Sequence, residues 1–190
     1  MPPSQRELSG AQWVARFPDT KATSSLANDF RPGCEAFIAA MKAADAEVSV
    51  NSTRRPAERA YLMHHAWRIH KQTLNPQNVP AKAGVNIEWV HRKADGSIDL
   101  TASRKAATAM VNGYGIVFQP ALNSRHTEGR AIDMSISWTG KLAVKNKSGT
   151  VVTISSTPRS GMNVDLRKVG RTFGVIKNTS DKPHWSTDGH

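Results

Sequence analysis

The clearest pattern in this chain is an alternation of apolar and polar side chains between residues 131 and 138. Ile132, Met134 and Ile136 occupy every second position, and polar residues stand between them. This two-residue period is typical of a β-strand with one buried face. The pattern therefore predicts a strand whose apolar side faces the core, and it places Asp133 on the opposite side, toward a cleft.

Helical and strand-like patterns follow one another irregularly in the rest of the chain. The predicted helices cover residues 56–72, 101–112 with Gly113 as the C-terminal cap, and 163–173 with Asn163 as the N-cap; the predicted strands are residues 48–52 and a hairpin within 141–156. Strands separated by helices in irregular order favour a small α+β fold over a doubly wound sheet. We expect a single-domain protein with a short antiparallel sheet flanked by helices.

Two segments stand apart from these elements. In residues 1–30 the pattern predicts one short helix, with Ser9 as its N-cap and Trp13 on its apolar side. We expect residues 1–30 to pack as an extension on a catalytic domain that spans residues 31–190, because 190 residues with 38% apolar content suffice for one sizeable core. Residues 73–100 are the longest weakly patterned stretch, which is typical of a substrate lid or a disordered connection.

Two histidines and one aspartate in the C-terminal half are the strongest candidates for chemistry. His126 precedes the predicted strand, Asp133 lies on its polar face, and His184 comes near the end of the chain. Two imidazoles and one carboxylate commonly hold a catalytic zinc ion, because three protein ligands leave a fourth position open. Asp181, three residues before His184, is the candidate general base. The residues therefore predict a zinc hydrolase.

The order and spacing of these residues resemble those of one zinc peptidase family. The pattern Ser-x-His-x-x-Gly-x-Ala-x-Asp, followed by Asp-x-Pro-His-aromatic, is similar to that of D-Ala-D-Ala carboxypeptidases and L-alanyl-D-glutamate endopeptidases, which include VanY-like enzymes and phage endolysins. The matching residues are Ser124, His126, Gly129, Ala131, Asp133, Asp181, Pro183 and His184. Many members carry Glu where this chain has Asp181. The resemblance covers roughly residues 35–186.

The resemblance also implies roles for residues that are not candidate metal ligands. Domains of this family carry Ser-x-x-Arg at the end of a strand, and Ser52 and Arg55 match that pattern. This implies that Arg55 stabilises the oxyanion that develops on the scissile carbonyl, and that Ser124 and Arg55 contact the substrate. Arg54 is an adjacent alternative for that role, and an arginine just before Pro56 is also typical of a solvated helix start.

Each of these residue types also has an ordinary structural interpretation. A single His or Asp is more often a hydrogen-bonding or turn-capping residue than a ligand. His65 falls on the apolar stripe of the helix predicted for residues 56–72, which indicates a side chain that faces the core. We expect His91 and His190 to contact solvent. Cys34 is the one cysteine, which excludes an intramolecular disulfide, and its helical context indicates a buried thiol.

The formal net charge of +11 indicates attraction to polyanions. The basic residues are spread along the chain without a dense run or interleaved aromatic residues, so we expect no specific nucleic-acid binding. Part of the charge is expected to be a solvated surface. The rest fits attraction to the anionic bacterial cell envelope, which would weaken as salt concentration rises.

The function that we expect is cleavage of a peptide bond in the stem peptide of peptidoglycan by a monomer. Since we see no secretory or transmembrane segment, we expect synthesis in the cytoplasm and action on the wall after lysis or delivery, as a phage or prophage lysin or an effector of a contractile injection system. Two other classes stay open: a non-catalytic, metal-containing wall-binding module, and a nucleic-acid-binding protein that relies on charge alone. The sequence also leaves open which bond is cut.

Overall fold

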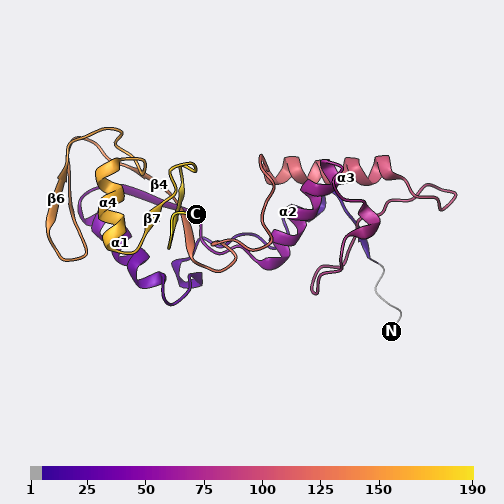
Figure 1. The fold of residues 1–190 in the computed structure, drawn as a ribbon, viewed down its shortest axis with the longest axis horizontal. Helices are drawn as coiled ribbons and strands as arrows, with labels where there is room; N and C mark the ends of the chain where they lie inside the picture. Colours follow the sequence, from indigo (N-terminus) through magenta and orange to yellow (C-terminus); the bar gives the residue numbers. More distant parts are fainter. Residues whose placement is uncertain (1–5) are drawn as a thin grey trace. The chain divides into compact units, whose positions relative to one another are not determined.

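The structure is a computed structural model that describes residues 6–190, and its fold is α+β, as predicted (Figure 1). In chain order the elements are β1 (Glu7–Leu8), the 3-10 helices η1 (Ala11–Trp13) and η2 (Thr23–Ser25), α1 (Arg31–Ala43), β2 (Glu47–Ser52), α2 (Ala57–His70), the 3-10 helix η3 (Pro76–Asn78), β3 (Ile87–Glu88), α3 (Leu100–Tyr114), β4 (Ala131–Ser137), β5 (Leu142–Lys145), β6 (Val151–Ile154), α4 (Val164–Thr172), β7 (Ile176–Lys177) and β8 (His184–Ser186).

Contacts within the chain divide it into two compact units. The first, called the helical unit here, comprises the N-terminal segment up to Pro18 together with Pro56–Leu122; the second, called the sheet unit, comprises Asp19–Arg55 and Asn123–His190. Each unit has its own cluster of buried apolar side chains. The boundary expected at residue 30 is not a boundary between these units, because residues 6–18 and 19–30 fall in different ones. Whether residues 31–190 act as one catalytic domain stays a prediction.

The sheet unit is built on a four-stranded antiparallel sheet with the strand order β2-β4-β8-β7. β4 is a central strand, and its side chains alternate as predicted. Ile132, Met134 and Ile136 are buried, whereas Asp133 lies on the other face. α1 contacts β2 and α4 contacts β7, and Figure 1 shows both helices beside the sheet. The predicted hairpin is present as β5 and β6.

The core of the sheet unit combines the apolar face of the sheet with apolar side chains of α1 and α4. Phe37 on α1 and Trp185 on β8 are fully buried, with ring centroids 5.4 Å apart. Burial of one large apolar side chain contributes about 1.5–3 kcal/mol, so these contacts hold β8 against the helix. Cys34 is also buried here, and burial raises the pKa of its thiol to about 12, which makes it a core residue and no nucleophile.

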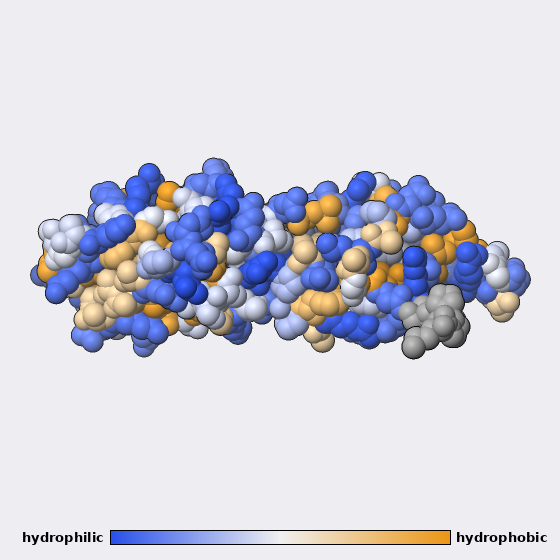
Figure 2. All heavy atoms as spheres, turned by 90° about the horizontal axis from the view of Figure 1, so that it is seen from below, coloured by the Kyte–Doolittle hydropathy of each residue, from blue (hydrophilic) through white to orange (hydrophobic). Residues whose placement is uncertain are grey.

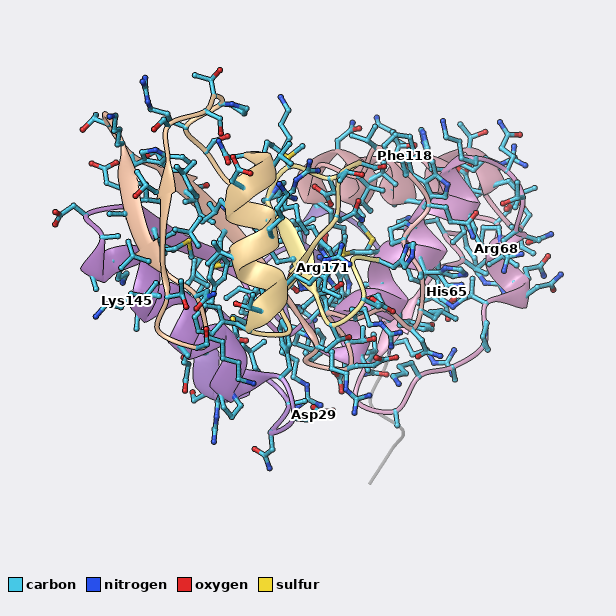
Figure 3. All side chains as sticks on the ribbon, turned by 60° about the vertical axis from the view of Figure 1, so that its left-hand side comes forward. Asp29, His65, Arg68, Phe118, Lys145 and Arg171 are labelled. Carbon is cyan, nitrogen blue, oxygen red and sulfur yellow. The ribbon has the colours of Figure 1, made fainter. Side chains whose placement is uncertain are left out.

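The helical unit is held together by α2 packed against α3. His65 on α2 faces this core, as predicted, with 3% of its surface exposed, and Figure 3 labels it on the ribbon. Its ring lies edge-on to Tyr61 at 4.6 Å, and neither ring nitrogen has a hydrogen-bond partner. Burial, together with His64 and Arg68 nearby, lowers the pKa of His65 to about 4. The imidazole is therefore neutral at physiological pH.

The predicted end of the helix at residues 101–112 is wrong. α3 continues through Gly113, and Gly115 is the C-cap with a φ of 65° in the left-handed region. Gly113 has a different reason to be glycine, since a Cβ at this position would lie 2.7 Å from Val14 Cγ2. A glycine does cap α3, as predicted, but the capping residue is Gly115, whereas Gly113 allows close packing against Val14.

The prediction for the N-terminal segment also needs correction. The short helix there is the single 3-10 turn η1, preceded by Gly10, and Ser9 does not cap it. The Ser9 hydroxyl instead lies 3.1 Å from Nε2 of His91, and the same nitrogen lies 3.2 Å from the Ser9 carbonyl oxygen. His91 is therefore hydrogen-bonded and of intermediate exposure, so it contacts solvent only in part.

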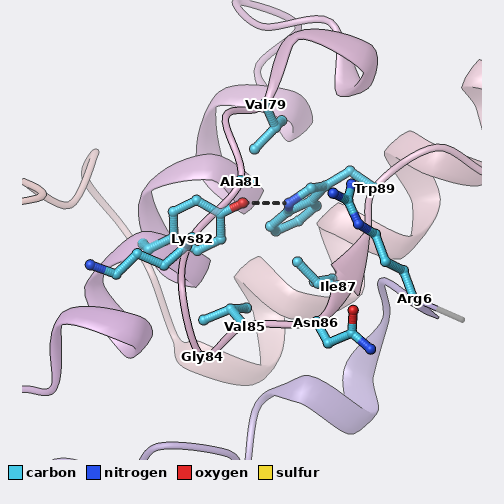
Figure 4. A pocket seen from close by; sticks show the side chains of 10 residues that line it. Arg6, Val79, Ala81, Lys82, Gly84, Val85, Asn86, Ile87 and Trp89 are labelled. Carbon is cyan, nitrogen blue, oxygen red and sulfur yellow. Dashed lines mark hydrogen bonds between the residues drawn. The ribbon is translucent and has the colours of Figure 1, made fainter. Parts of the chain in front are cut away.

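Residues 73–100 are packed into the helical unit, which argues against the lid or disordered connection that the weak pattern suggested. β3 lies in this stretch and pairs in parallel with β1. Trp89 is buried in the core of the unit, and its Nε1 donates a hydrogen bond to the Tyr61 hydroxyl. Residues 79–89 line much of a cavity of about 400 Å³, which Figure 4 shows with this hydrogen bond.

The face of the molecule shown in Figure 2 is largely hydrophilic, with scattered hydrophobic residues. Val117 and Phe118, in the segment after α3, are the most exposed large apolar side chains among the described residues, and Figure 3 labels Phe118. Within residues 6–190, no helix has the length and apolar character needed to cross a membrane.

Candidate metal centre

Strand register places Asp133 between two other parts of the predicted site. In the antiparallel pair with β8, Asp133 lies directly opposite His184, and in the pair with β2 it lies opposite Ser52. Directly opposed residues on one sheet face have Cβ atoms about 4.5–5.5 Å apart. The register therefore brings the carboxylate of Asp133 within reach of the His184 ring, although 51 positions separate the two residues in the sequence.

A tight turn before β4 positions His126. The Ser124 carbonyl accepts a hydrogen bond from the Thr127 hydroxyl, and the Gly129 amide donates to the His126 carbonyl. Gly129 has a φ of 72°, which favours glycine, and a Cβ there would also lie 3.1 Å from the Ala27 amide nitrogen. The His126 carbonyl in addition accepts the Arg55 amide. The glycine turn thus aims His126 back toward the start of β4.

A buried lysine organises the loop that carries His184. The ammonium of Lys177 donates hydrogen bonds to the carbonyls of Asn178, Asp181 and His184, and the first and last of these measure 2.7 and 2.8 Å. An ammonium has three N–H donors, so all of them are used in this loop. Lys177 is 6% exposed, and burial lowers its pKa to about 8, against the opposing influence of Asp181 and Asp133. Sequence reasoning missed this residue.

Three side-chain atoms converge on one point. His126 Nε2 lies 3.1 Å from His184 Nδ1, and Asp133 Oδ1 lies 3.3 Å from the first nitrogen and 3.2 Å from the second. His126 and His184 are 7% and 8% exposed, so water competes little for these atoms. The structure therefore brings together the three residues that the sequence predicted as ligands, and they form a group that can hold a metal ion.

The outer nitrogen of each imidazole is engaged by a backbone oxygen. His126 Nδ1 lies 2.6 Å from the Thr53 carbonyl, and His184 Nε2 lies 3.0 Å from the His190 oxygen. A carbonyl oxygen can only accept, so these outer nitrogens carry the protons. In the neutral rings the two inner nitrogens then present lone pairs to each other and to Asp133. Metal-binding histidines are typically oriented in this way.

The donor set fits a tetrahedral metal ion. Ligand atoms that lie about 2.0–2.1 Å from a tetrahedral metal are roughly 3.3 Å from one another, and the three distances here are 3.1, 3.2 and 3.3 Å. Asp133 Oδ1 is buried and accepts no hydrogen bond of good geometry. A buried carboxylate oxygen without a donor is costly. A cation at the centre of the three atoms would satisfy it together with both lone pairs.

The electrostatics of the protein groups favour an ionised carboxylate at this centre. Burial raises the pKa of Asp133, but the neighbouring His126 and His184 rings outweigh burial and hold that pKa well below its usual range. Burial lowers the pKa of His126, but Asp133 and the Thr53 carbonyl outweigh it, so the pKa of His126 is raised overall. The carboxylate is therefore ionised, and the site attracts positive charge.

Arg55 lies beside the centre, held by an acidic residue that the sequence gave no reason to select. Its Nε and Nη2 donate to both carboxylate oxygens of Asp19 at 3.0–3.3 Å. The Ser52 hydroxyl also points to Asp19, at 3.4 Å. The Arg55 amide donates to the His126 carbonyl at 3.0 Å, which joins the backbone of Arg55 to the turn that carries His126. Asp19 had no motif around it that could have identified it.

The other residues of the predicted site are placed less directly. Asp181 is exposed, and the hydrogen bonds described for it use its backbone carbonyl, which accepts from Lys177 and from the His184 amide. Its role as a base stays a prediction. Ser124 lies in the wall of a cavity of about 300 Å³ that also includes His184 and His190. This location is compatible with the predicted contact to substrate but does not test it.

Comparison with protein-family models, curated proteins and solved structures gave no match for this chain. The resemblance to zinc peptidases therefore rests on the motif residues themselves.

Proposed function

We propose that this protein is a zinc-dependent peptidase that cleaves a peptide bond in the stem peptide of peptidoglycan. The observation that carries the proposal is the convergence of His126 Nε2, His184 Nδ1 and Asp133 Oδ1, with both outer ring nitrogens held by backbone oxygens. The motif resemblance supplies the peptidase chemistry and the wall substrate.

Zinc is the metal that this donor set favours. Two imidazole nitrogens and one carboxylate oxygen are a common ligand set of catalytic zinc, and three ligands leave a fourth position for chemistry. When bound, zinc would supply Lewis-acid chemistry that acidifies water and polarises a substrate carbonyl. Thr53 and His190 keep the ring protons on the outer side, and Asp133 balances the charge of the cation.

Two residues are proposed to act on the reacting atoms. Arg55 would donate to the carbonyl oxygen as negative charge develops on it, and Asp19 would hold the guanidinium by Nε and Nη2 so that Nη1 stays available for the substrate. The Asp181 carboxylate would take a proton from the attacking water and return it to the leaving amine. Ser124 is proposed to contact the substrate from the turn that carries His126.

The biological setting is proposed from the same resemblance together with the net charge. A charge of +11 would draw the protein to the anionic cell envelope. A phage or prophage lysin is the proposed role, and an effector of a contractile injection system is the alternative. Both act on the wall after release or delivery. We propose a monomer, because the three candidate ligands come from one chain.

Hydrolysis of purified peptidoglycan tests the proposal. Turbidity and the masses of released fragments would be measured for the protein as isolated, after chelation, and after zinc is restored, with His126→Ala as the variant that lacks a ligand. We expect release that depends on zinc and is absent from the variant, and the fragment masses identify the bond. Bound zinc without release would favour the non-catalytic wall-binding module.

A further inference from the structure

A second cavity in the sheet unit adjoins the metal centre. It has a volume of about 440 Å³, and its walls are Met134–Ile136 on β4, residues 160–162 and the Lys182–Pro183 pair. Two of these walls run directly into the candidate ligands, since Met134 follows Asp133 and Pro183 precedes His184. The Met134 amide donates to the Pro183 carbonyl at 2.9 Å, which joins the two walls at the end nearest the ligands.

The face of the sheet that carries Asp133 leads into this cavity. Asp133 and Ser135 lie on the same face of β4, about 7 Å apart along the strand. Asn51 on β2 donates from its side-chain amide to the Ser135 hydroxyl at 2.9 Å, and both residues line the cavity. A chain bound across the metal centre would therefore meet hydrogen-bonding side chains as it continues along this face.

The cavity exists because β4 has no full partner on one edge. β8 pairs with β4 over residues 131–133, and farther along that edge an isolated bridge joins Ser137 to Ser160. Between these two points the cavity separates β4 from residues 160–162. An extended segment can insert a side chain at such a break toward the core side of the sheet.

The lining selects for an apolar group next to a negative charge. Met134 and Ile136 are 2% and 5% exposed and belong to the core, so the inner wall is apolar. Lys182 is the one charged residue among the described residues that line the cavity, and it is exposed. A ligand with a small apolar group inside and an anionic group near the rim would match both features.

One buried donor near Gly161, a residue of the cavity wall, also lacks a partner. Trp185 Nε1 is buried without a hydrogen bond. A Cβ placed on Gly161, which lines the cavity, would lie 3.7 Å from that nitrogen and 3.5 Å from Ile136 Cδ1, both ordinary contact distances. The absence of a side chain at Gly161 thus keeps space open beside an unused N–H donor.

We propose that this cavity is the subsite for the peptide residue beside the scissile bond, and that Lys182 recognises a free carboxylate of that segment. The inference rests on the proposed function. Stem peptides carry a free α-carboxylate wherever D-glutamate is linked through its γ-carboxyl group, and amidation to D-isoglutamine removes that charge. The subsite therefore distinguishes the acid form of the stem peptide from the amidated form.

Two variants and a pair of peptides test this subsite. The zinc-loaded protein would be assayed with a stem pentapeptide in its D-glutamate and D-isoglutamine forms. We expect Lys182→Met to raise KM about tenfold for the acid form alone, which corresponds to loss of one charge-assisted contact. Gly161→Ala fits at ordinary contact distances and partly fills the cavity, so it should raise KM for both peptides. Zinc content should stay unchanged in both variants.

Lys145→Met is the matched control, because Lys145 is an exposed lysine on β5 that does not line the cavity; Figure 3 labels it. If the protein cleaves both peptides and Lys182→Met keeps the wild-type preference, the subsite is wrong while the proposed function stands. If the protein cleaves neither peptide, the proposed function is wrong, and calorimetric binding of the same pair decides the subsite. If the wild-type protein binds the acid form more tightly and Lys182→Met abolishes this preference, the subsite is supported. If neither peptide binds, the subsite is wrong.

Discussion

His126 Nε2 and His184 Nδ1 face each other at 3.1 Å, and each ring has its other nitrogen on a backbone oxygen. Two neutral imidazoles in this tautomeric state place lone pair against lone pair, which is unfavourable without a cation between them. The rings are also buried, so water does not relieve the repulsion. The arrangement therefore fits a pair of metal ligands, with Asp133 as the third member.

Zinc should stabilise the folded protein through this group. A metal that binds the folded state and not the unfolded state adds about 2.7 kcal/mol at a hundredfold excess over its dissociation constant. We expect the melting temperature to rise by several degrees with zinc, and expect no rise in His184→Ala. His70→Ala, a histidine change in the helical unit, is the control and should keep the full rise. An equal response of His184→Ala would remove His184 from the ligand set.

Replacing Asp181 with Ala should leave zinc content unchanged and reduce turnover by about 10²–10⁴-fold, the range typical of a lost general base. Asp181→Glu should retain a measurable part of the activity, because the carboxylate is kept. Asp95→Ala, which removes an exposed aspartate in the helical unit, serves as the control. Wild-type turnover in Asp181→Ala would exclude Asp181 as the base.

Asp19 and Arg55 should behave as one functional pair. We expect Arg55→Gln to lower kcat by about 10²–10³-fold, as removal of an oxyanion donor does, and Asp19→Ala to lower it less, because the guanidinium stays but loses its anchor. The double variant should be no slower than Arg55→Gln alone. Fully additive losses in the double-mutant cycle would show that the two side chains act independently.

Lys177→Met should weaken both the fold and the metal centre. The change removes the ammonium donor from three backbone carbonyls, of which those of Asp181 and His184 keep a backbone N–H donor, at a cost on the order of 1–3 kcal/mol. Because one of these carbonyls belongs to His184, zinc affinity should fall even under conditions where the variant is fully folded. Lys168→Met removes an exposed lysine from α4 and is the control. Calorimetric zinc titration of both variants measures the difference, and equal affinities would contradict the positioning role.

His65 should make stability depend on pH. Its pKa is about 4 in the folded protein, lowered by burial and then by His64 and Arg68, against about 6.5 in an unfolded chain. The unfolded state therefore binds more protons than the folded state between pH 4 and pH 6.5. The stabilising contribution of the buried, neutral His65 ring is complete above pH 6.5 and is lost as the pH falls toward 4. At about 1.4 kcal/mol for each pKa unit, the loss is about 3 kcal/mol.

His65→Gln removes this titration and provides the comparison. The free energy of unfolding by denaturant would be measured for both proteins at pH 7.5 and pH 4.5. The wild-type protein should lose more stability than the variant between the two conditions, because all other titrating groups are common to both. An equal loss in both proteins would mean that His65 is already accessible to protons in the folded state.

Local signals in the sequence determined much of this protein. The two-residue alternation around Asp133 sets a strand with a buried face, since that period is intrinsic to a pleated chain. Gly129 is found in the left-handed conformation that the turn requires, and Asn163 caps α4 as expected. The sequence also selected the three residues that the structure brings together, because their types and the short motifs around them are visible in the sequence.

The tertiary structure decided what depends on contacts between distant segments. Strand register sets Asp133 opposite His184, and chain folding brings Asp19 to Arg55 and the Thr53 carbonyl to His126. The division into two units, each with its own core, also arises from packing, so composition alone did not reveal it. A backbone carbonyl such as that of Thr53 has no sequence signature, because every residue has one. A lone aspartate such as Asp19 has none either, because aspartates are common at surface positions.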